Sequence, residues 1–235
     1  MASSQHARSH PGGFQESIAY PVLWPLRYAV IWTILLLLLA LIAMSLDFYF
    51  AKQVWPDGMA IDRMEHLLRQ SAAIAPESGL ATPLSEGVYW VFFGLTGIHD
   101  QVVAARDSAA LLQPLGSASL LASMHEELSV AMIAAKLFGT RLAVAVAALP
   151  LFLLAWSAFT LDGLAERLIR KACGGRESAT IYHLAKHSHF ALLPVLLALY
   201  LCVPVHIDPL WVVLPAILVS GSLLRLQAKY FKKHV

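Results

Sequence analysis

The stretch YAVIWTILLLLLALIAMSL, residues 28–46, contains no charged residue between Arg27 and Asp47. A helix needs about 20 mostly apolar residues to cross the hydrocarbon layer of a membrane. This stretch therefore predicts a membrane-spanning helix. Because it is longer and more apolar at its centre than the core of a typical signal peptide, we interpret it as an anchor that is not cleaved.

Three more apolar stretches occur in the second half of the chain, at residues 142–161, 190–207 and 208–224, and the last is uncharged from Pro209 onward. The last two flank the short connection VHIDPLW (205–211), so we expect them to be antiparallel neighbours. The composition agrees, because 58% of the residues are hydrophobic and only 14% are charged, against about 25% charged in an average soluble domain. We predict an all-α polytopic membrane protein with four transmembrane helices.

The connection between the first two spans, residues 47–141, is too periodic to be a simple linker. Apolar residues recur on one helical face in 61–75 and again in 117–138. If the second of these joins the span at 142–161, it forms one helix of about 40 residues. Residues 87–98, GVYWVFFGLTGI, are too short to cross a membrane and rich in aromatic rings, which prefer the headgroup level. We predict a helical loop with an interfacial or re-entrant segment.

The distribution of Lys and Arg predicts the orientation. Basic residues outnumber acidic ones by two to one in 1–27, five to three in 162–189 and four to none in 225–235, whereas 47–141 has six basic and ten acidic residues. We therefore expect a protein of the bacterial inner (cytoplasmic) membrane. The tail 1–27, the loop 162–189 and the tail 225–235 would be cytoplasmic, so both termini would be too, and 47–141 would be periplasmic.

No catalytic or cofactor-binding motif is evident in the sequence. HEELS at His125 begins like a zinc-protease motif, but the second histidine is replaced by Ser129. Neither a GxxxxGK[ST] nor a GxGxxG phosphate-binding pattern occurs. Asp47, Asp162 and Asp208 lie at the ends of predicted spans, and we interpret them as boundary markers. We predict no enzymatic activity, no cofactor and, at a net charge of +2, no direct binding of nucleic acid.

The segment GGRESATIYHLAKHSHF, residues 174–190, is the densest in reactive side chains. His183 and His187 are four residues apart, which places both imidazoles on one helical face, and His189 is nearby. A closed metal site normally needs four ligands, so we favour an amphipathic helix that enters the third span. A metal-binding membrane protein that uses these three histidines, and a small membrane transporter, stay open as alternatives.

The chain from Leu84 onward also resembles a known family, the TraJ-like membrane proteins of integrating conjugative elements. The pieces that carry the resemblance are DGL at Asp162, GRES at Gly175, YH at Tyr182, AK at Ala185, the proline-containing hairpin at 204–215, and FKK at Phe231. His187 and His189 depart from the family pattern, so the resemblance does not include a three-histidine site.

The resemblance implies a non-catalytic inner-membrane component of a conjugative type IV secretion apparatus. Its expected partners are the coupling ATPase, other conjugation proteins and membrane lipids, and a homo-oligomer is possible. We expect the partner-docking residues to be Arg176, Glu177, Tyr182, His183 and Lys186. We expect the residues that attract lipid headgroups to be Lys229, Lys232 and Lys233.

Overall fold

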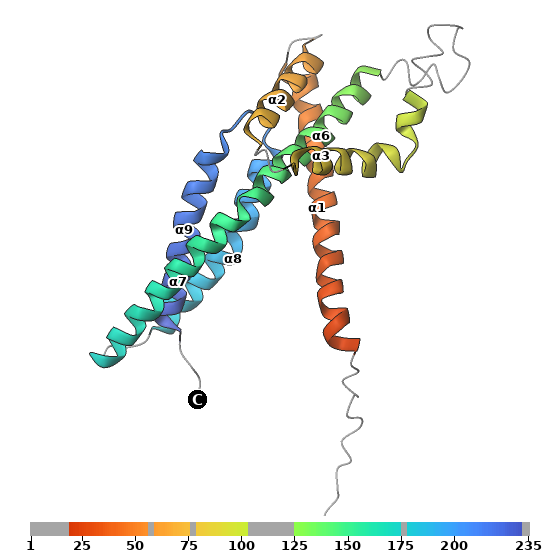
Figure 1. The fold of residues 1–235 in the computed structure, drawn as a ribbon. Helices are drawn as coiled ribbons and strands as arrows, with labels where there is room; N and C mark the ends of the chain where they lie inside the picture. The colour runs from red at the N-terminus through yellow and green to blue at the C-terminus, as the bar shows by residue number, and fades with distance from the viewer. Residues whose placement is uncertain (1–18, 56–58, 76–78, 103–124, 175–177, 232–235) are drawn as a thin grey trace, which may run out of the picture. The chain divides into compact units, whose positions relative to one another are not determined.

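The computed structural model describes residues 19–55, 59–75, 79–102, 125–174 and 178–231. Within these ranges every regular element is helical (Figure 1). Four helical segments are long and apolar enough to cross a membrane, which confirms the predicted fold class. They are α1 (Ala19–Gln53), the pair α6 (His125–Ala147) and α7 (Leu149–Ala172), α8 (Ala179–Cys202) and α9 (Pro209–Tyr230). Three shorter elements follow α1, namely α2 (Ala60–Ile74), α3 (Ala81–Tyr89) and the π-helical turn η1 (Trp90–Gly94).

The chain divides inside α1, between Leu38 and Leu39, into two compact units. In the first unit, large apolar side chains such as Trp32 and Ile34 are exposed. Thr33 satisfies its hydroxyl by donating to the carbonyl of Ala29, at 2.9 Å. A helix that is apolar on all sides is typical of a membrane span.

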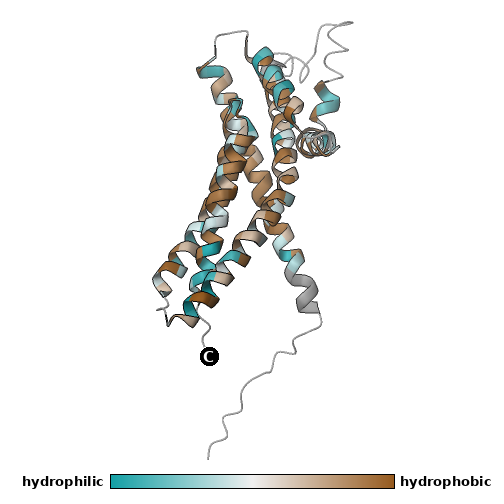
Figure 2. Ribbon diagram, turned by 60° about the vertical axis from the view of Figure 1, so that its left-hand side comes forward, coloured by the Kyte–Doolittle hydropathy of each residue, from teal (hydrophilic) through white to brown (hydrophobic). Residues whose placement is uncertain are grey.

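The second unit has two buried apolar clusters. One consists of Ala40, Ala43, Phe138, Leu201 and Cys202, and the other of Ala60, Met64, Val130, Ala134 and Leu137. Helix α6 contributes to both clusters, so it is the central helix of this unit. Apolar residues occupy the middle of α6 to α9, and hydrophilic residues gather toward the helix ends (Figure 2).

Helices α6 and α7 follow one another with a break only at Ala148. The amide of Ala148 still donates to Val144, and the amide of Phe152 to Ala148, both at 3.1 Å. The break comes two residues before Pro150, which has no amide hydrogen and cannot continue the ladder. The predicted helix of about 40 residues is therefore present as two consecutive helices.

The third and fourth long helices differ in extent from the predicted spans 190–207 and 208–224. Helix α8 begins at Ala179, because the Ser178 hydroxyl accepts from the amide of Ile181 (3.4 Å), and it ends at Cys202, before Pro204. Helix α9 begins after Asp208, whose carboxylate accepts from the amide of Leu210 at 2.9 Å. Charged residues set the predicted boundaries. Helix α9 nevertheless continues through Arg225 and Lys229, because both side chains pair with Glu166 of α7.

Helix α3 lies across α6 (Figure 1). The crossing depends on Gly139 of α6, because a Cβ atom there would lie 2.6 Å from the carbonyl oxygen of Leu84. Beside the crossing, Ser85 donates to the carbonyl of Lys136 (3.1 Å), and the Lys136 ammonium pairs with Glu86 (3.1 Å). Burial, and then the charge of Glu86, raises the pKa of Tyr89, which follows on the same helix. Residues 84–86, which precede the segment 87–98, are thus held against α6. The interfacial or re-entrant position of 87–98 stays a prediction.

Candidate docking site at the charged ends of α7, α8 and α9

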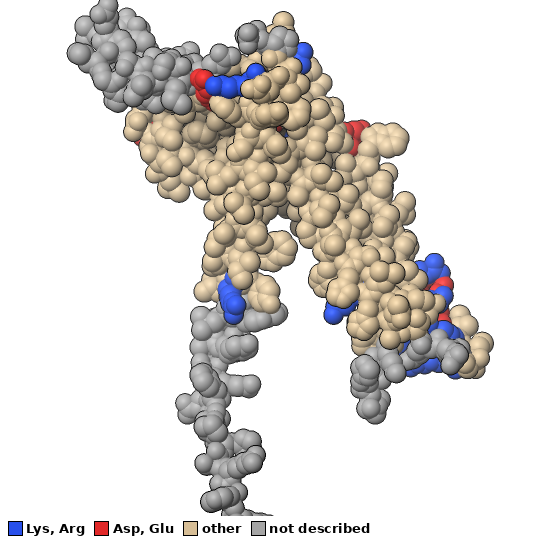
Figure 3. All heavy atoms as spheres, turned by 180° about the vertical axis from the view of Figure 1, so that it is seen from behind, with Lys and Arg blue, Asp and Glu red and all other residues tan. Residues whose placement is uncertain are grey.

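Charged side chains gather where α7 ends, α8 begins and α9 ends, a region we call the charged junction (Figure 3). Its described members are Asp162, Glu166, Arg167, Arg170, Lys171, Tyr182, Lys186, Arg225, Lys229, Tyr230 and Phe231. Six of these are basic and two are acidic, so the junction carries net positive charge.

A ladder of ion pairs joins α7 to α9. Asp162 and Glu166 are four residues apart on α7, and Arg225 and Lys229 are four apart on α9, so each pair lies on one helical face. The Arg225 guanidinium pairs with Asp162 (2.6 Å) and with Glu166, and the Lys229 ammonium pairs with Glu166 (2.7 Å). All four side chains stay between 27% and 53% exposed, so the ladder contributes more to register than to stability.

Gly163 allows the two helices to come close enough for this ladder. A Cβ atom at Gly163 would lie 2.5 Å from the carbonyl oxygen of Arg225 and 2.9 Å from the Cβ of Ala228. The backbones of α7 and α9 therefore touch at this point. Small residues permit such close contacts between membrane helices.

Two arginines of α7 bind the aromatic end of α9. The Arg170 guanidinium lies 4.5 Å from the centre of the Tyr230 ring, and that of Arg167 lies 5.3 Å from the centre of the Phe231 ring. Arg170 also donates to the backbone carbonyl of Lys229, one of the last carbonyls of α9, which have no partner within the helix. These contacts fix the last turn of α9 against α7.

Helix α8 joins the junction through Tyr182, one of the predicted docking residues. Its ring packs against Phe231 at 5.8 Å and against His183 at 5.3 Å. Further along, the Gln227 amide donates to the carbonyl of Ala185 (3.3 Å). Of the other predicted docking residues, His183 is exposed and Lys186 is half-buried.

Of the remaining residues predicted for docking or for lipid headgroups, the structure describes only Lys229. Arg176, Glu177, Lys232 and Lys233 lie outside the described residues. Lys229, predicted to attract lipid headgroups, is bound to Glu166. The sequence analysis did not identify the ladder, although the two i,i+4 pairs are visible in the sequence.

The three histidines of α8 do not come together. His183 and His187 are exposed, whereas the ring of His189 is half-buried and packs against Trp156 at 5.5 Å. The indole nitrogen of Trp156 in turn donates to the buried Ser220 hydroxyl at 3.0 Å. Among the residues that the structure describes, no three His, Cys, Asp or Glu side chains are arranged to hold a metal ion.

A second polar centre lies inside the protein, at Arg141 of α6. The guanidinium is 4% exposed and donates to the backbone carbonyls of Leu201 (3.4 Å), Val203 (2.6 Å) and Val205 (2.9 Å). These carbonyls belong to the end of α8 and to the connection that follows it. One arginine thus holds the α8–α9 turn against α6.

Asp47 is the acidic partner of this centre. It is 3% exposed, it interacts electrostatically with Arg141, and its Oδ1 atom has no hydrogen-bond partner. Asp47 is therefore a buried group of the second unit, and its interpretation as the end of a membrane span stays a prediction. The sequence could not reveal this burial, because Asp47 and Arg141 each adjoin an apolar run. A charged residue at a membrane boundary and a buried charged residue can both occupy such a position.

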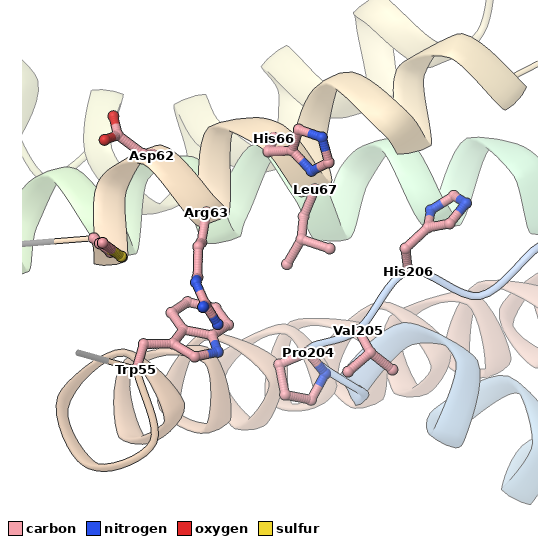
Figure 4. Close-up of a pocket in the computed structure, with 9 residues that line it drawn as sticks. Trp55, Asp62, Arg63, His66, Leu67, Pro204, Val205 and His206 are labelled. Atoms are coloured by element: carbon pink, nitrogen blue, oxygen red, sulfur yellow. The ribbon is translucent and has the colours of Figure 1, made fainter.

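A groove of about 510 Å³ lies between α2 and the α8–α9 turn (Figure 4). Arg63 crosses it toward Trp55, with its guanidinium 5.9 Å from the centre of the indole ring. Pro204, Val205 and His206 form the opposite wall. The groove borders the carbonyls that Arg141 binds, so its shape depends on that arginine.

Comparison with known proteins identifies one matching family. The sequence profile described as "IncC plasmid conjugative DNA transfer protein DtrJ-like" matches residues 59–232. The matched range includes α2, Arg141, the charged junction and every residue that lines the groove except Trp55. No curated protein and no solved structure matches the chain.

Proposed function

Because the chain belongs to the DtrJ-like family of conjugative DNA transfer proteins, we propose that it is a non-catalytic membrane component of a type IV secretion apparatus. The observation that carries this proposal is the family match, which extends over most of the chain and all of the charged junction. The chain is thus a conjugation-related membrane protein, as the sequence resemblance implied. Its closer likeness to the TraJ-like proteins of integrating elements stays our prediction.

The charged junction is the surface that we assign to partner docking. It combines net positive charge with the exposed ring of Phe231 and the half-buried rings of Tyr182 and Tyr230 at the ends of three helices. An acidic face of the coupling ATPase would complement it, because opposite potentials steer association and fix orientation. The predicted docking residues Arg176 and Glu177 precede Ser178, the cap of α8, in the sequence.

The docking proposal is tested by affinity purification of the tagged full-length protein from detergent-solubilised donor membranes, followed by mass spectrometry. We expect the coupling ATPase to be recovered. In the double variant Arg176→Ala, Glu177→Ala, we expect recovery and DNA transfer to fall about tenfold, which is what a loss of 1.4 kcal/mol of binding produces.

The matched control is Glu65→Ala with Arg69→Ala, which removes the same two residue types from an exposed i,i+4 pair on α2 (2.8 Å). It should transfer DNA at the wild-type rate. Immunoblots must show equal amounts of all three proteins. Wild-type transfer by the Arg176, Glu177 variant would remove the docking assignment, and stoichiometric zinc in the purified protein would favour the metal-binding alternative.

The proposed orientation in the membrane can be tested by labelling a native cysteine, so no new cysteine has to be introduced. The exposed thiol of Cys173 lies just after α7, at the charged junction, while Cys202 is buried. A membrane-impermeant maleimide should therefore leave the protein unmodified in intact cells and modify it in inverted membrane vesicles. Cys173→Ser should abolish the labelling of vesicles. Labelling of Cys173 in intact cells would place the junction on the periplasmic side and exclude a cytoplasmic ATPase as its partner.

A further inference from the structure

An exposed apolar stripe on α7 leads directly to a cluster of basic residues. Leu161, Leu164 and Leu168 are 67%, 40% and 69% exposed, and their spacing places them along one side of the helix. Lys171 comes three residues after Leu168 and continues the stripe. Arg167 and Arg170 precede Lys171 by four residues and one residue, so the three cations lie within about one helical turn.

The three cations repel one another unless an anion lies among them. Like charges at i,i+3 and i,i+4 destabilise a helix. The two acidic residues described at the junction, Asp162 and Glu166, are already bound to Arg225 and Lys229. No described carboxylate of the junction therefore pairs with Arg167, Arg170 or Lys171.

The two guanidinium groups are held in place but keep unused donors. Arg170 donates from one nitrogen to the Lys229 carbonyl, while its Nε and Nη1 atoms are enclosed and have no hydrogen-bond partner. The Nε of Arg167 is likewise enclosed and unpaired. These enclosed nitrogens are out of reach of a ligand, so a phosphate would meet the accessible part of the half-buried Arg167 and Arg170 side chains and the exposed Lys171. Phosphate oxygens are the acceptors that guanidinium forks fit best. The rings of Tyr230 and Phe231 already fix both groups.

We propose that Arg167, Arg170 and Lys171 bind the phosphate of an anionic phospholipid, whose acyl chains lie along Leu164 and Leu168. Basic pockets at the ends of membrane helices bind such headgroups. A free phosphate ion or an acidic polypeptide would satisfy the charge, but neither would use the apolar stripe that ends at the cluster. The site differs from the predicted lipid residue Lys229, whose ammonium is bound to Glu166.

The test is native mass spectrometry of the purified full-length protein with added phosphatidylglycerol or phosphatidylcholine. We expect the wild type to retain phosphatidylglycerol in preference to phosphatidylcholine. A cation near an anionic lipid contributes about fivefold in affinity, so Arg167→Gln with Arg170→Gln should reduce the preference about 25-fold. Arg63→Gln with Arg69→Gln on α2 removes the same charge and should leave the preference unchanged.

Each outcome decides the proposal. Equal retention of the two lipids by the wild type, or an unchanged preference in the Arg167, Arg170 variant, overturns it. Displacement of the lipid by inorganic phosphate alone would show a phosphate site instead. If the double variant melts below the wild type, Lys171→Gln replaces it, since this exposed side chain should cost about fivefold by itself. The protein is purified and free of partners, so failure here would not bear on docking of the coupling ATPase.

Discussion

Replacing Arg141 by glutamine is expected to destabilise the second unit by about 1–3 kcal/mol for each buried carbonyl that is left without its donor. The substitution leaves the carbonyls of Val203 and Val205 without their donor and leaves the buried Asp47 without a compensating charge. We therefore expect a lower melting temperature in detergent and strongly reduced accumulation in the membrane, and DNA transfer should be lost with the protein.

Arg69→Gln is the matched control for Arg141→Gln, because it removes the same group from an exposed position on α2. Its stability should stay within about 0.5 kcal/mol of the wild type. Adding Asp47→Asn to Arg141→Gln should recover part of the loss, since the uncompensated carboxylate is then gone. A melting temperature of Arg141→Gln equal to that of the wild type would show that the arginine does not hold the α8–α9 turn.

Gly163→Leu is expected to separate α7 from α9. The new side chain would begin 2.5 Å from the carbonyl oxygen of Arg225 and 2.9 Å from Ala228 Cβ, where there is no room even for a methyl group. Overpacking of this kind typically costs about 1–3 kcal/mol, and here it also disrupts the ion-pair ladder. We expect a lower melting temperature together with weaker recovery of the partner in affinity purification.

The control for Gly163 is Gly87→Ala on α3, where a Cβ atom would meet nothing within 4 Å. Alanine is preferred over glycine inside a helix by about 0.5–1 kcal/mol, so this variant should melt slightly above the wild type. The two substitutions thus have opposite expected signs. An equal or higher melting temperature for Gly163→Leu would contradict the close contact of α7 with α9.

The fold was largely predictable because membrane spans follow from length and the absence of charge, which are local properties of the sequence. The helix ends were not, because they depend on contacts with distant residues. Helix α9 continues to Tyr230 since Arg225 and Lys229 are bound by α7, and nothing in residues 225–230 alone indicates that. Similarly, α8 begins at a local cap, Ser178, but its end at Cys202 depends on the turn that Arg141 binds.

The candidate site was predictable only as a region. The segment 174–190 is visibly dense in reactive side chains, and the i,i+4 pairs of α7 and α9 are visible in the sequence, but the assignment of this region to docking stays a prediction. Which cations would be paired was not predictable, because Glu166 meets residues of α9 about 60 positions away along the chain. The spacing of His183 and His187 predicted a shared helical face, and both are exposed on α8. The packing of His189 against Trp156 was not predictable, because it depends on a residue of another helix.

The contact of Arg141 with main-chain carbonyls has an evolutionary consequence. Every residue type has a backbone carbonyl, so positions 201, 203 and 205 can exchange one side chain for another without losing the contact. The arginine has no such freedom, because lysine cannot reach several carbonyls with a planar fork. Selection should therefore act on the path of the turn and on this one side chain, and related sequences should diverge around a fixed arginine.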